Sequence, residues 1–170
     1  GELREVAADI DGEVARLNRL VNDVLDYARP LHFDRTLVDL NAVCRDSASA
    51  AQATPGAPIS LRLAPDAGTL LTDGERLRLA LVNLLVNARH AVEGRAPADV
   101  VLATRRASDD VVIEVSDTGA GIAAQDLARV FEPFFTTRRG GTGLGLPITR
   151  NIVEGLGGTI GVSSEVDRGT

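Results

Sequence analysis

Residues 111–146, VVIEVSDTGAGIAAQDLARVFEPFFTTRRGGTGLGL, constrain the fold of this chain more than any other stretch. Alternating apolar residues at positions 111, 113 and 115 predict a half-buried strand that ends at Asp117. Gly119 and Gly121 come directly after this strand end, and glycine allows both a positive φ and a close approach of the backbone to a ligand. The carboxylate of Asp117 would then lie at the mouth of a strand, where it could accept a hydrogen bond from an exocyclic amine.

The same stretch ends in a glycine-rich loop. Gly140, Gly141, Gly143 and Gly145 lead directly into an apolar helical pattern over residues 142–156. A helix N-terminus carries free N–H groups and the positive end of the helix dipole, and both favour an anion such as phosphate. Each glycine pair alone is typical of an ordinary tight turn, so the prediction depends on the ordered set.

Three segments, DTGAGI, FEPFFTT and GTGLGL, follow one another in this stretch, and an asparagine-containing segment, DGERLRLALVNLLVNARHAV, lies upstream at residues 73–92. Together they resemble the first glycine box, the phenylalanine box, the second glycine box and the asparagine box of the sensor histidine kinases of two-component systems. This family belongs to the Bergerat-fold (GHKL) ATPase superfamily. The resemblance implies ATP and Mg²⁺ as the ligands.

The resemblance also implies where a nucleotide would bind. Asn87, the second asparagine of its box, would coordinate Mg²⁺, and Asp117 would accept a hydrogen bond from the adenine amine. The loop at 141–145 would bind the phosphates. The expected contacts are Asn83, Asn87, Arg89, His90, Asp117, Gly119, Gly121, Ile122, Arg138, Arg139, Gly141, Thr142, Gly143, Leu144, Gly145 and Leu146.

Two of these expected contact residues, Asn83 and His90, have an alternative interpretation. Asn83 could instead cap a neighbouring loop with its side chain. His90 stands where many relatives have lysine or arginine, and histidine is charged only part of the time at neutral pH, whereas Arg89 is permanently charged. Residues 136–141 have no hydrophobic periodicity, and we expect them to form a mobile lid over the nucleotide.

The remaining pattern predicts an α/β fold. Strands are expected at 38–40, 59–63, 70–72, 100–106, 111–117 and 159–163, and helices at 42–53, 75–92, 125–130 and 142–156. Asn41 is the expected N-cap of the first of these helices. The expected architecture is a two-layer α/β sandwich, the Bergerat fold, in which three helices cover one face of a mixed sheet.

Residues 1–31 are predicted to form one long helix of the coiled-coil type. Apolar residues recur every seventh position from Leu3 to Leu31, and Pro30 should end the helix. The segment DVLDYARPLHFD resembles the second helix of the dimerisation and histidine-phosphotransfer hairpin of the kinases. The expected domains are therefore 1–32, part of that hairpin, and 33–170, a catalytic ATP-binding domain that lacks its last strand. The alternative is a single amphipathic helix that packs on its own domain.

The chain begins without Met and stops at Thr170, so we expect a piece of a longer protein. Neither of its two histidines, His32 and His90, lies in a phosphoacceptor motif. The resemblance implies transfer of the γ-phosphoryl group of ATP to a histidine on a hairpin helix missing from this piece, for relay to the receiver domain of a response regulator. It also implies a homodimer through the N-terminal helix. No catalytic residue is assigned, and we expect ATP binding without efficient autophosphorylation.

Two other functions remain open at this point. One is a clamp-type GHKL ATPase of the gyrase, Hsp90 or MutL kind, against which FEPFFTT and the 1–31 helix argue. The other is a degenerate nucleotide-binding adapter, against which Asn87, Asp117 and the 141–145 glycines argue.

Composition excludes several classes of function. The net charge of −6 argues against a nucleic-acid-binding surface. No apolar run approaches the roughly 18 residues of a membrane span, and the single Cys44 excludes a disulfide framework and suits a reducing compartment. We therefore expect a cytoplasmic domain, and the sequence leaves open whether the full-length protein is anchored in a membrane.

Overall fold

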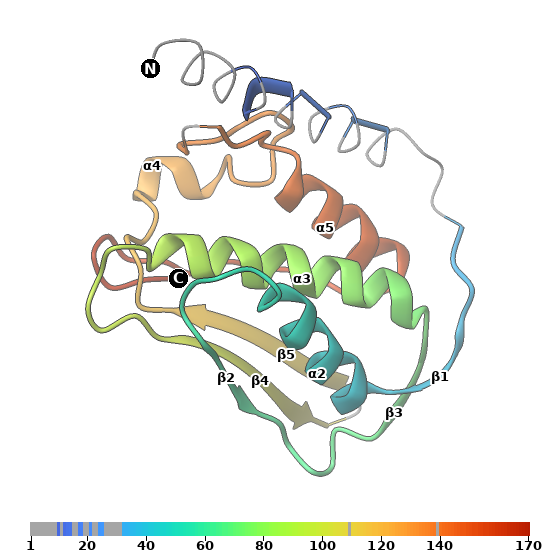
Figure 1. Cartoon of the computed structure of the whole chain (residues 1–170). Coiled ribbons are helices and arrows are strands. Elements are labelled where there is room, and N and C mark those ends of the chain that lie inside the picture. Colours follow the sequence, from blue (N-terminus) through green and yellow to red (C-terminus); the bar gives the residue numbers. More distant parts are fainter. Residues whose placement is uncertain are drawn as a thin grey trace.

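The computed structural model describes residues 32–108, 110–138 and 140–170, together with residues 10, 12–14, 17–18, 21 and 24–25 (Figure 1). The predicted helix over 1–31, with Leu3, Pro30 and Leu31, therefore lies largely outside the described residues, as does Arg139. The described residues before position 26 have helical backbone. The exposed apolar side chains among them are Ile10, Val14, Leu17, Val21, Val24 and Leu25.

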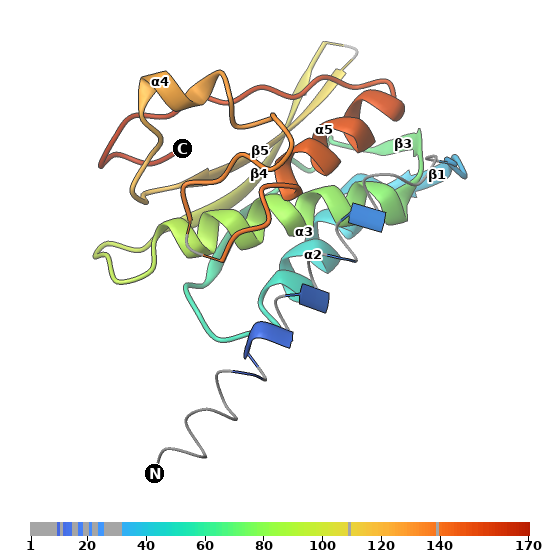
Figure 2. The same cartoon turned by 90° about the horizontal axis from the view of Figure 1, so that it is seen from above.

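The elements follow the predicted order. They are β1 (Thr36–Asp39), α2 (Leu40–Ala51), β2 (Ile59–Arg62), β3 (Thr69–Thr72), α3 (Gly74–Ala91), β4 (Val100–Ala107), β5 (Asp110–Asp117), α4 (Ala124–Leu127) and α5 (Gly145–Gly155). β2 pairs in parallel with β4, and β4 pairs antiparallel with β5, which gives a mixed three-stranded sheet. β1 and β3 form a separate antiparallel ribbon. The ribbon lies at the N-terminal end of α3, and α4 lies at the opposite end (Figures 1 and 2).

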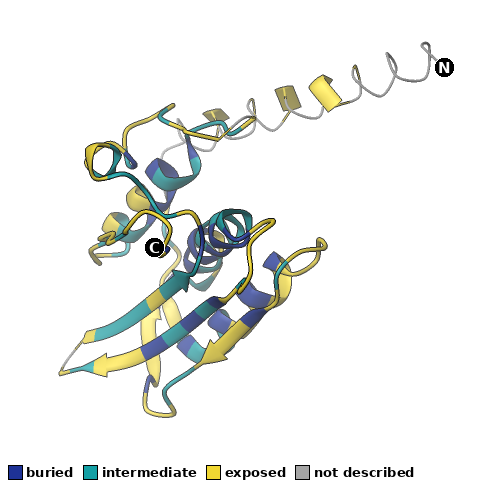
Figure 3. Cartoon of the chain, turned by 90° about the vertical axis from the view of Figure 1, so that its left-hand side faces the viewer, coloured by how far each residue is buried: buried dark blue, intermediate teal, exposed yellow. Residues whose placement is uncertain are grey.

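The main core lies between the three-stranded sheet and the helices α2 and α3. Leu40 and Cys44 of α2, Leu85 of α3 and Leu102 of β4 are all 0% exposed. Buried and partly exposed positions alternate along the first half of β4, as expected for a strand with one covered face (Figure 3). Burial raises the pKa of the Cys44 thiol to about 11, so this thiol stays protonated and unreactive at neutral pH.

The predicted mixed α/β fold is confirmed, with one difference in how its third helix packs. α5 packs mainly on α3 and has a small core of its own. This second core contains Ala80 of α3 and Leu144, Ile148 and Ile152 at the start and along the length of α5. α3 is thus the central helix, because it contacts the sheet on one side and α5 on another (Figure 1).

Two local predictions are wrong. α2 is capped by Asp39, whose Oδ1 accepts hydrogen bonds from the main-chain N–H groups of Asn41 (2.9 Å) and Ala42 (3.2 Å). Asn41 was the expected N-cap, but β1 runs directly into the helix at Leu40, so Asn41 lies in the first turn. Its side chain instead donates to the carbonyl oxygen of Ala64 at 2.8 Å.

The strand expected at 159–163 is not formed in the described structure. The main chain at the end of β5 pairs with a later residue, because Asp117 N donates to Thr170 O (2.9 Å) and Thr170 N donates to Asp117 O (3.3 Å). A turn at 165–169 precedes this pair and is held by a hydrogen bond from Asp167 N to Ala120 O of 2.9 Å. The chain therefore reaches β5 through a turn at this point, and residues 159–163 stay mostly exposed.

Residues 33–35, which we call the linker strap, are fixed to the ends of two helices. Asp34 N donates to Oδ2 of Asp73 at 2.9 Å, and Nη2 of Arg35 donates to the carbonyl oxygen of Gly155 at 3.0 Å. The ring of Phe33 lies where a side chain at Gly155 would be. Burial alone would raise the pKa of Asp73, but hydrogen bonds from the N–H groups of Arg76 and Asp34 lower it overall. The strap thus joins the start of α3 to the end of α5.

No helix in the described part of the chain has both the length and the apolar character needed to cross a bilayer.

The buried hydroxyl of Thr149 gives a first prediction. Thr149 lies in α5, is 0% exposed, and its Oγ1 has no hydrogen-bond partner within the described residues. A buried polar group without a partner costs about 1–3 kcal/mol, so Thr149→Val, which keeps the shape, should stabilise the fold by about 1 kcal/mol. Urea denaturation at pH 7 measures this change. Thr104→Val is the contrasting control, because Thr104 is also buried but its Oγ1 hydrogen-bonds Asn41 (3.1 Å). A loss of stability in Thr149→Val would contradict the prediction.

Candidate functional site

α3 carries the predicted asparagines on the side that meets α5 and the loop before it. Nδ2 of Asn83 donates to the carbonyl oxygen of Gly145 at 3.0 Å. A Cβ added at Gly145 would lie 3.0 Å from Oδ1 of Asn83, so glycine at this position permits the close approach. Asn83 therefore holds the first residue of α5 against α3, which agrees with its alternative interpretation as a residue that caps a neighbouring loop.

Asn87 lies one turn further along α3 and contacts the segment before the glycine-rich loop. Its Oδ1 accepts a hydrogen bond from Nη1 of Arg138 at 3.3 Å. His90 lies close to this pair, and its pKa is lowered first by burial and then by the positive charge of Arg138. A lowered pKa makes the imidazole of His90 mostly neutral at pH 7, so it adds little positive charge to this part of the molecule.

Arg89 does not join this group. Its side chain is 6% exposed and points to the loop after α2. Nε donates to Ala57 O (2.8 Å), Nη2 donates to Thr54 O (2.8 Å), and Nη1 donates to Ala51 O. The expectation that Arg89 contacts a nucleotide is therefore wrong, because three main-chain carbonyls already hold its guanidinium on the far side of α3.

Asp117 lies at the end of β5, as predicted. Its Oδ1 accepts a hydrogen bond from Gly119 N at 2.8 Å, and its main chain pairs with Thr170. Burial raises the pKa of Asp117, and the hydrogen bonds from the N–H groups of Gly119 and Thr170 offset this only in part. The carboxylate therefore lies in a partly desolvated place at a strand end, where a hydrogen-bond donor from a ligand would be favourable.

The glycines after Asp117 allow close contacts within the protein. Gly119 is buried, and a Cβ added there would lie 2.5 Å from the carbonyl oxygen of Ala91, at the end of α3. Gly121 has φ +66°, and a side chain there would collide with the main chain of Glu165. We expected these glycines to make room for a ligand, but contacts with α3 and the 165–169 turn already explain both of them.

The glycine-rich loop at 141–145 is braced against the phenylalanine-rich segment. Phe134 N donates to Gly143 O at 2.9 Å, and Gly143 has φ +68°. Leu144 N donates to Oγ1 of Thr142 at 3.4 Å, and Leu144 is 0% exposed. These contacts hold the loop at the N-terminus of α5.

The N-terminus of α5 differs from those of α2 and α3. Asp39 and Asp73 cap α2 and α3 through their side chains, whereas Leu144, the N-cap of α5, makes no side-chain hydrogen bond. The N-cap side chain thus leaves the N–H groups of Gly145 and Leu146 uncapped, and Pro147, the third residue of α5, has no N–H. A helix end of this kind suits an anion.

Two residues near Asp117 were not predicted from the sequence. Oγ of Ser164 accepts a hydrogen bond from Ile122 N (2.8 Å), donates to Gly169 O (2.7 Å) and lies 2.9 Å from Oγ1 of Thr170. Ser164 and Thr170 thus hold the 119–122 turn and the end of β5 in place. In the sequence, only the glycine of the Gly169–Thr170 pair indicated a special backbone conformation here. In the structure Gly169 has φ +109° and its backbone packs against the carbonyl oxygen of Asp117.

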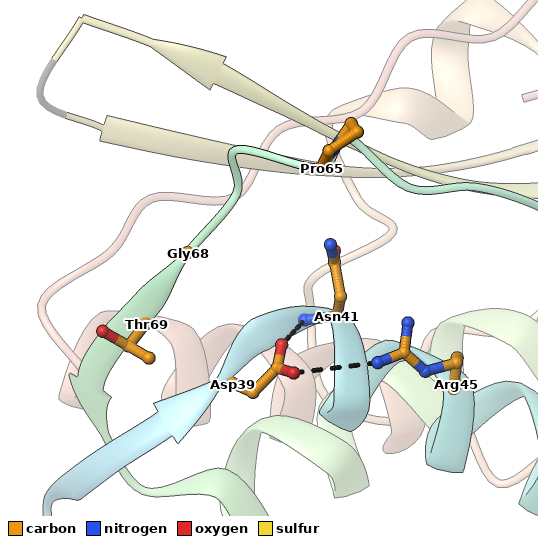
Figure 4. A pocket seen from close by; sticks show the side chains of 6 residues that line it. All are labelled: Asp39, Asn41, Arg45, Pro65, Gly68 and Thr69. Atoms are coloured by element: carbon orange, nitrogen blue, oxygen red, sulfur yellow. Dashed lines mark hydrogen bonds and ion pairs between the residues drawn. The ribbon is translucent and has the colours of Figure 1, made fainter.

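A polar hollow of about 300 Å³ lies elsewhere, at the start of α2 (Figure 4). The carboxylate of Asp39 caps α2 there and lies 3.7 Å from Nη2 of Arg45. The side chains of Asp39, Asn41 and Arg45 in this hollow thus already have partners within the chain. The hollow contains none of the predicted site residues. The lining residues are Asp39, Asn41, Arg45, Pro65, Gly68 and Thr69.

Comparison with known proteins places the fold and these motifs in one family. The family model for histidine kinase-, DNA gyrase B- and HSP90-like ATPases matches residues 72–170, which include α3, β4, β5, α4 and α5. The chain belongs to this ATPase family.

Similar proteins extend this relation over nearly the whole chain. The sensor histidine kinase ZraS of Salmonella typhi is 38% identical over 172 residues, which cover 99% of this chain and 37% of ZraS. The structure of full-length ShkA in complex with AMPPNP has a TM-score of 0.75 and 30% identity, over 99% of this chain and 37% of ShkA. The chain thus spans about 37% of the length of these relatives.

The fold is also similar to that of the histidine kinase ThkA, whose structure contains the response regulator TrrA. This match has a TM-score of 0.77 and 23% identity, over 98% of this chain and 48% of ThkA. At this level of identity the match supports the fold alone.

Proposed function

We propose that this chain is the ATP-binding catalytic domain of a sensor histidine kinase and that it transfers the γ-phosphoryl group of ATP to a histidine other than His32 and His90. One observation supports this most strongly. Three successive turns of α3 contact the three parts of the expected site: Asn83 contacts Gly145, Asn87 contacts Arg138, and Ala91 contacts the 119–120 turn next to Asp117. The site then extends about 12 Å along α3, at about 1.5 Å per residue, with an anion end and a base end.

Each end of this proposed site has a chemistry that fits ATP. The carboxylate of Asp117 would accept a hydrogen bond from the adenine amine and would disfavour a carbonyl oxygen in the same position. The free N–H groups at the N-terminus of α5 and the loop at 141–145 would bind the phosphates. Phosphoryl transfer requires mainly positioning and charge neutralisation, so these binding residues would also be the ones that determine the rate.

The proposed metal site consists of one side-chain ligand. The described residues contain no cluster of three or more His, Cys, Asp or Glu side chains that could hold a metal ion. Mg²⁺ in nucleotide sites is often held by one or two protein oxygens, the phosphates and waters, and the amide oxygen of Asn87 is such a hard ligand. This oxygen already accepts a hydrogen bond from a cationic group, Arg138, in the structure, so it faces a positively charged group. When bound, Mg²⁺ would neutralise charge on the phosphates.

We also propose a domain boundary between residues 32 and 33. In addition, we propose two protein partners: a second copy of this chain and a response regulator. The linker strap at 33–35 is bound to α3 and α5, which supports 33–170 as the catalytic domain and 1–32 as part of a phosphotransfer hairpin. The exposed apolar residues of the N-terminal segment alternate at spacings of four and three from Ile10 to Val24, a pattern that favours a homodimer through a coiled-coil seam. The proposed downstream partner is the receiver domain of a response regulator, and the ThkA structure, which contains the response regulator protein TrrA, supports this proposal.

Two experiments on residues 1–170 test this proposal. Calorimetric titration with ADP should show binding that is stronger with Mg²⁺ than with EDTA, and binding that Mg²⁺ does not strengthen would support the adapter alternative instead. A histidine hairpin added as a separate chain should then acquire acid-labile phosphate from labelled ATP, while this chain acquires almost none. ATP turnover without labelling of any hairpin would favour the clamp-type ATPase. Rapid labelling of His32 or His90 would overturn the proposed acceptor.

A further inference from the structure

The side chain of Arg138 reaches back from the segment before the glycine-rich loop to α3. Its Nη1 donates to Oδ1 of Asn87 at 3.3 Å. The backbone of Arg138 is itself held in a turn, because Arg138 N donates to Oγ1 of Thr136 (3.1 Å) and Gly141 N donates to Arg138 O (3.2 Å). The turn therefore aims the guanidinium at α3, although the side chain is exposed.

Arg138 brings an unbalanced positive charge to this place. Among the ion pairs of the described residues, none joins Arg138 to a carboxylate. Glu93, which follows the end of α3, has its carboxylate 3.9 Å from Nε2 of His90. Asn87 Oδ1 is thus the acceptor that holds a cation, and a second cation on the same oxygen would be repelled by the guanidinium at short range.

We propose that Arg138 is a built-in substitute for the divalent cation: its guanidinium occupies Oδ1 of Asn87 in the nucleotide-free chain and must leave before a metal–nucleotide complex binds there. This inference depends on the proposed function, in which Asn87 is the metal ligand. Before the metal–nucleotide complex binds, Arg138 would occupy the oxygen of Asn87 and compete with the metal ion for it. The free energy needed to break the hydrogen bond between Arg138 and Asn87 then reduces the apparent affinity for the metal-bound nucleotide.

The contact can be tested first in the nucleotide-free protein. Histidine NMR titration is suitable because the chain has only two histidines, His32 and His90, and the charge of Arg138 lowers the pKa of His90. Arg138→Gln should therefore raise the pKa of His90. Asn87→Ala should also raise it, because Arg138 loses its anchor, and the double variant should match Arg138→Gln alone.

The other charges around His90 are the same in all these variants. Glu93 raises the pKa of His90 and Arg89 lowers it, and neither residue is changed. Arg105→Gln, which removes an exposed arginine from β4, is the control for a general loss of positive charge and should leave the pKa of His90 at its wild-type value. If Asn87→Ala leaves the pKa of His90 unchanged while Arg138→Gln raises it, Asn87 does not hold Arg138 and the inference is wrong.

The second test measures how strongly Mg²⁺ improves ADP binding. The ratio of the ADP dissociation constants in EDTA and in Mg²⁺ should be about three- to tenfold larger in Arg138→Gln than in the wild type, since even one exposed charged hydrogen bond is worth this much. Asn87→Ala should lose most of the Mg²⁺ effect, and Arg138→Gln should change nothing further in that background. An equal ratio in the wild type and Arg138→Gln would overturn this inference alone, whereas a wild-type chain that binds no ADP would overturn the proposed function.

Discussion

Replacing Arg89 by methionine should destabilise the fold by about 2–4 kcal/mol, because three main-chain carbonyl acceptors, of which that of Ala51 is buried, lose their donor. Arg89 is 6% exposed, and its guanidinium donates to the carbonyl oxygens of Ala51, Thr54 and Ala57. Methionine fills a similar volume but donates no hydrogen bond. Guanidinium chloride denaturation at pH 7 measures the difference in the free energy of unfolding.

Two further variants make this result specific. Arg78→Met on the same helix removes an exposed arginine that pairs with Glu75 at the surface, and its effect should stay below about 1 kcal/mol. Arg89→Lys keeps the charge but has fewer donors in a different geometry, so its stability should fall between the wild type and Arg89→Met. If Arg89→Met costs no more than Arg78→Met, the buried hydrogen bonds of Arg89 do not stabilise the fold as we argue.

Replacing Asp117 by asparagine should weaken ADP binding by about 1–3 kcal/mol, or roughly fivefold to 150-fold, while the fold gains stability at neutral pH. Asparagine keeps an oxygen that can accept from Gly119 N, so the turn after β5 should survive. It loses the negative charge that would face the adenine amine. Calorimetry measures the affinity, and thermal unfolding measures the stability.

The stability change has a sign that follows from the raised pKa of Asp117. Burial raises this pKa above its ordinary value of 3.8, so the folded state favours the protonated acid. The stabilisation that this group contributes is complete below its unfolded pKa and is lost as the pH rises through its folded pKa. Asp117→Asn should therefore match the wild type in strongly acidic solution and exceed it above the raised pKa. An affinity equal to that of the wild type would remove Asp117 from the proposed site, whatever the stability.

The sequence predicted best those parts of the molecule that depend on local patterns. The apolar spacing of α3, the alternation in β4 and β5, and the run of glycines into α5 each specify an element without reference to the rest of the chain. Asp117 was placed correctly at a strand end for the same reason. These elements are also the ones that the proposed site uses.

The errors concern groups whose partners lie far away in the sequence. Arg89 follows Asn87 by two positions, which is about 200° around a helix, so the two side chains cannot share a face. That angle could be read from the sequence, but the loop carbonyls that hold Arg89 could not. Gly119 and Gly121 posed the same difficulty, because their neighbours Ala91 and Glu165 are far along the chain. A glycine in a sequence indicates a close approach and does not say which atoms approach.

The two ends of α5 have different neighbours, and the helix fixes the distance between the glycine-rich loop at one end and the linker strap at the other. The carbonyl oxygen of its first residue, Gly145, accepts a hydrogen bond from Asn83 beside the glycine-rich loop. Its last residue, Gly155, contacts the ring of Phe33 and accepts a hydrogen bond from Arg35, both in the linker strap. Eleven residues of α-helix measure about 16 Å. The point where the chain enters this domain and the loop proposed to hold phosphate are therefore the two ends of one rigid rod. Any change in the distance between the N-terminal segment and that loop must then arise before Phe33, or else break the strap.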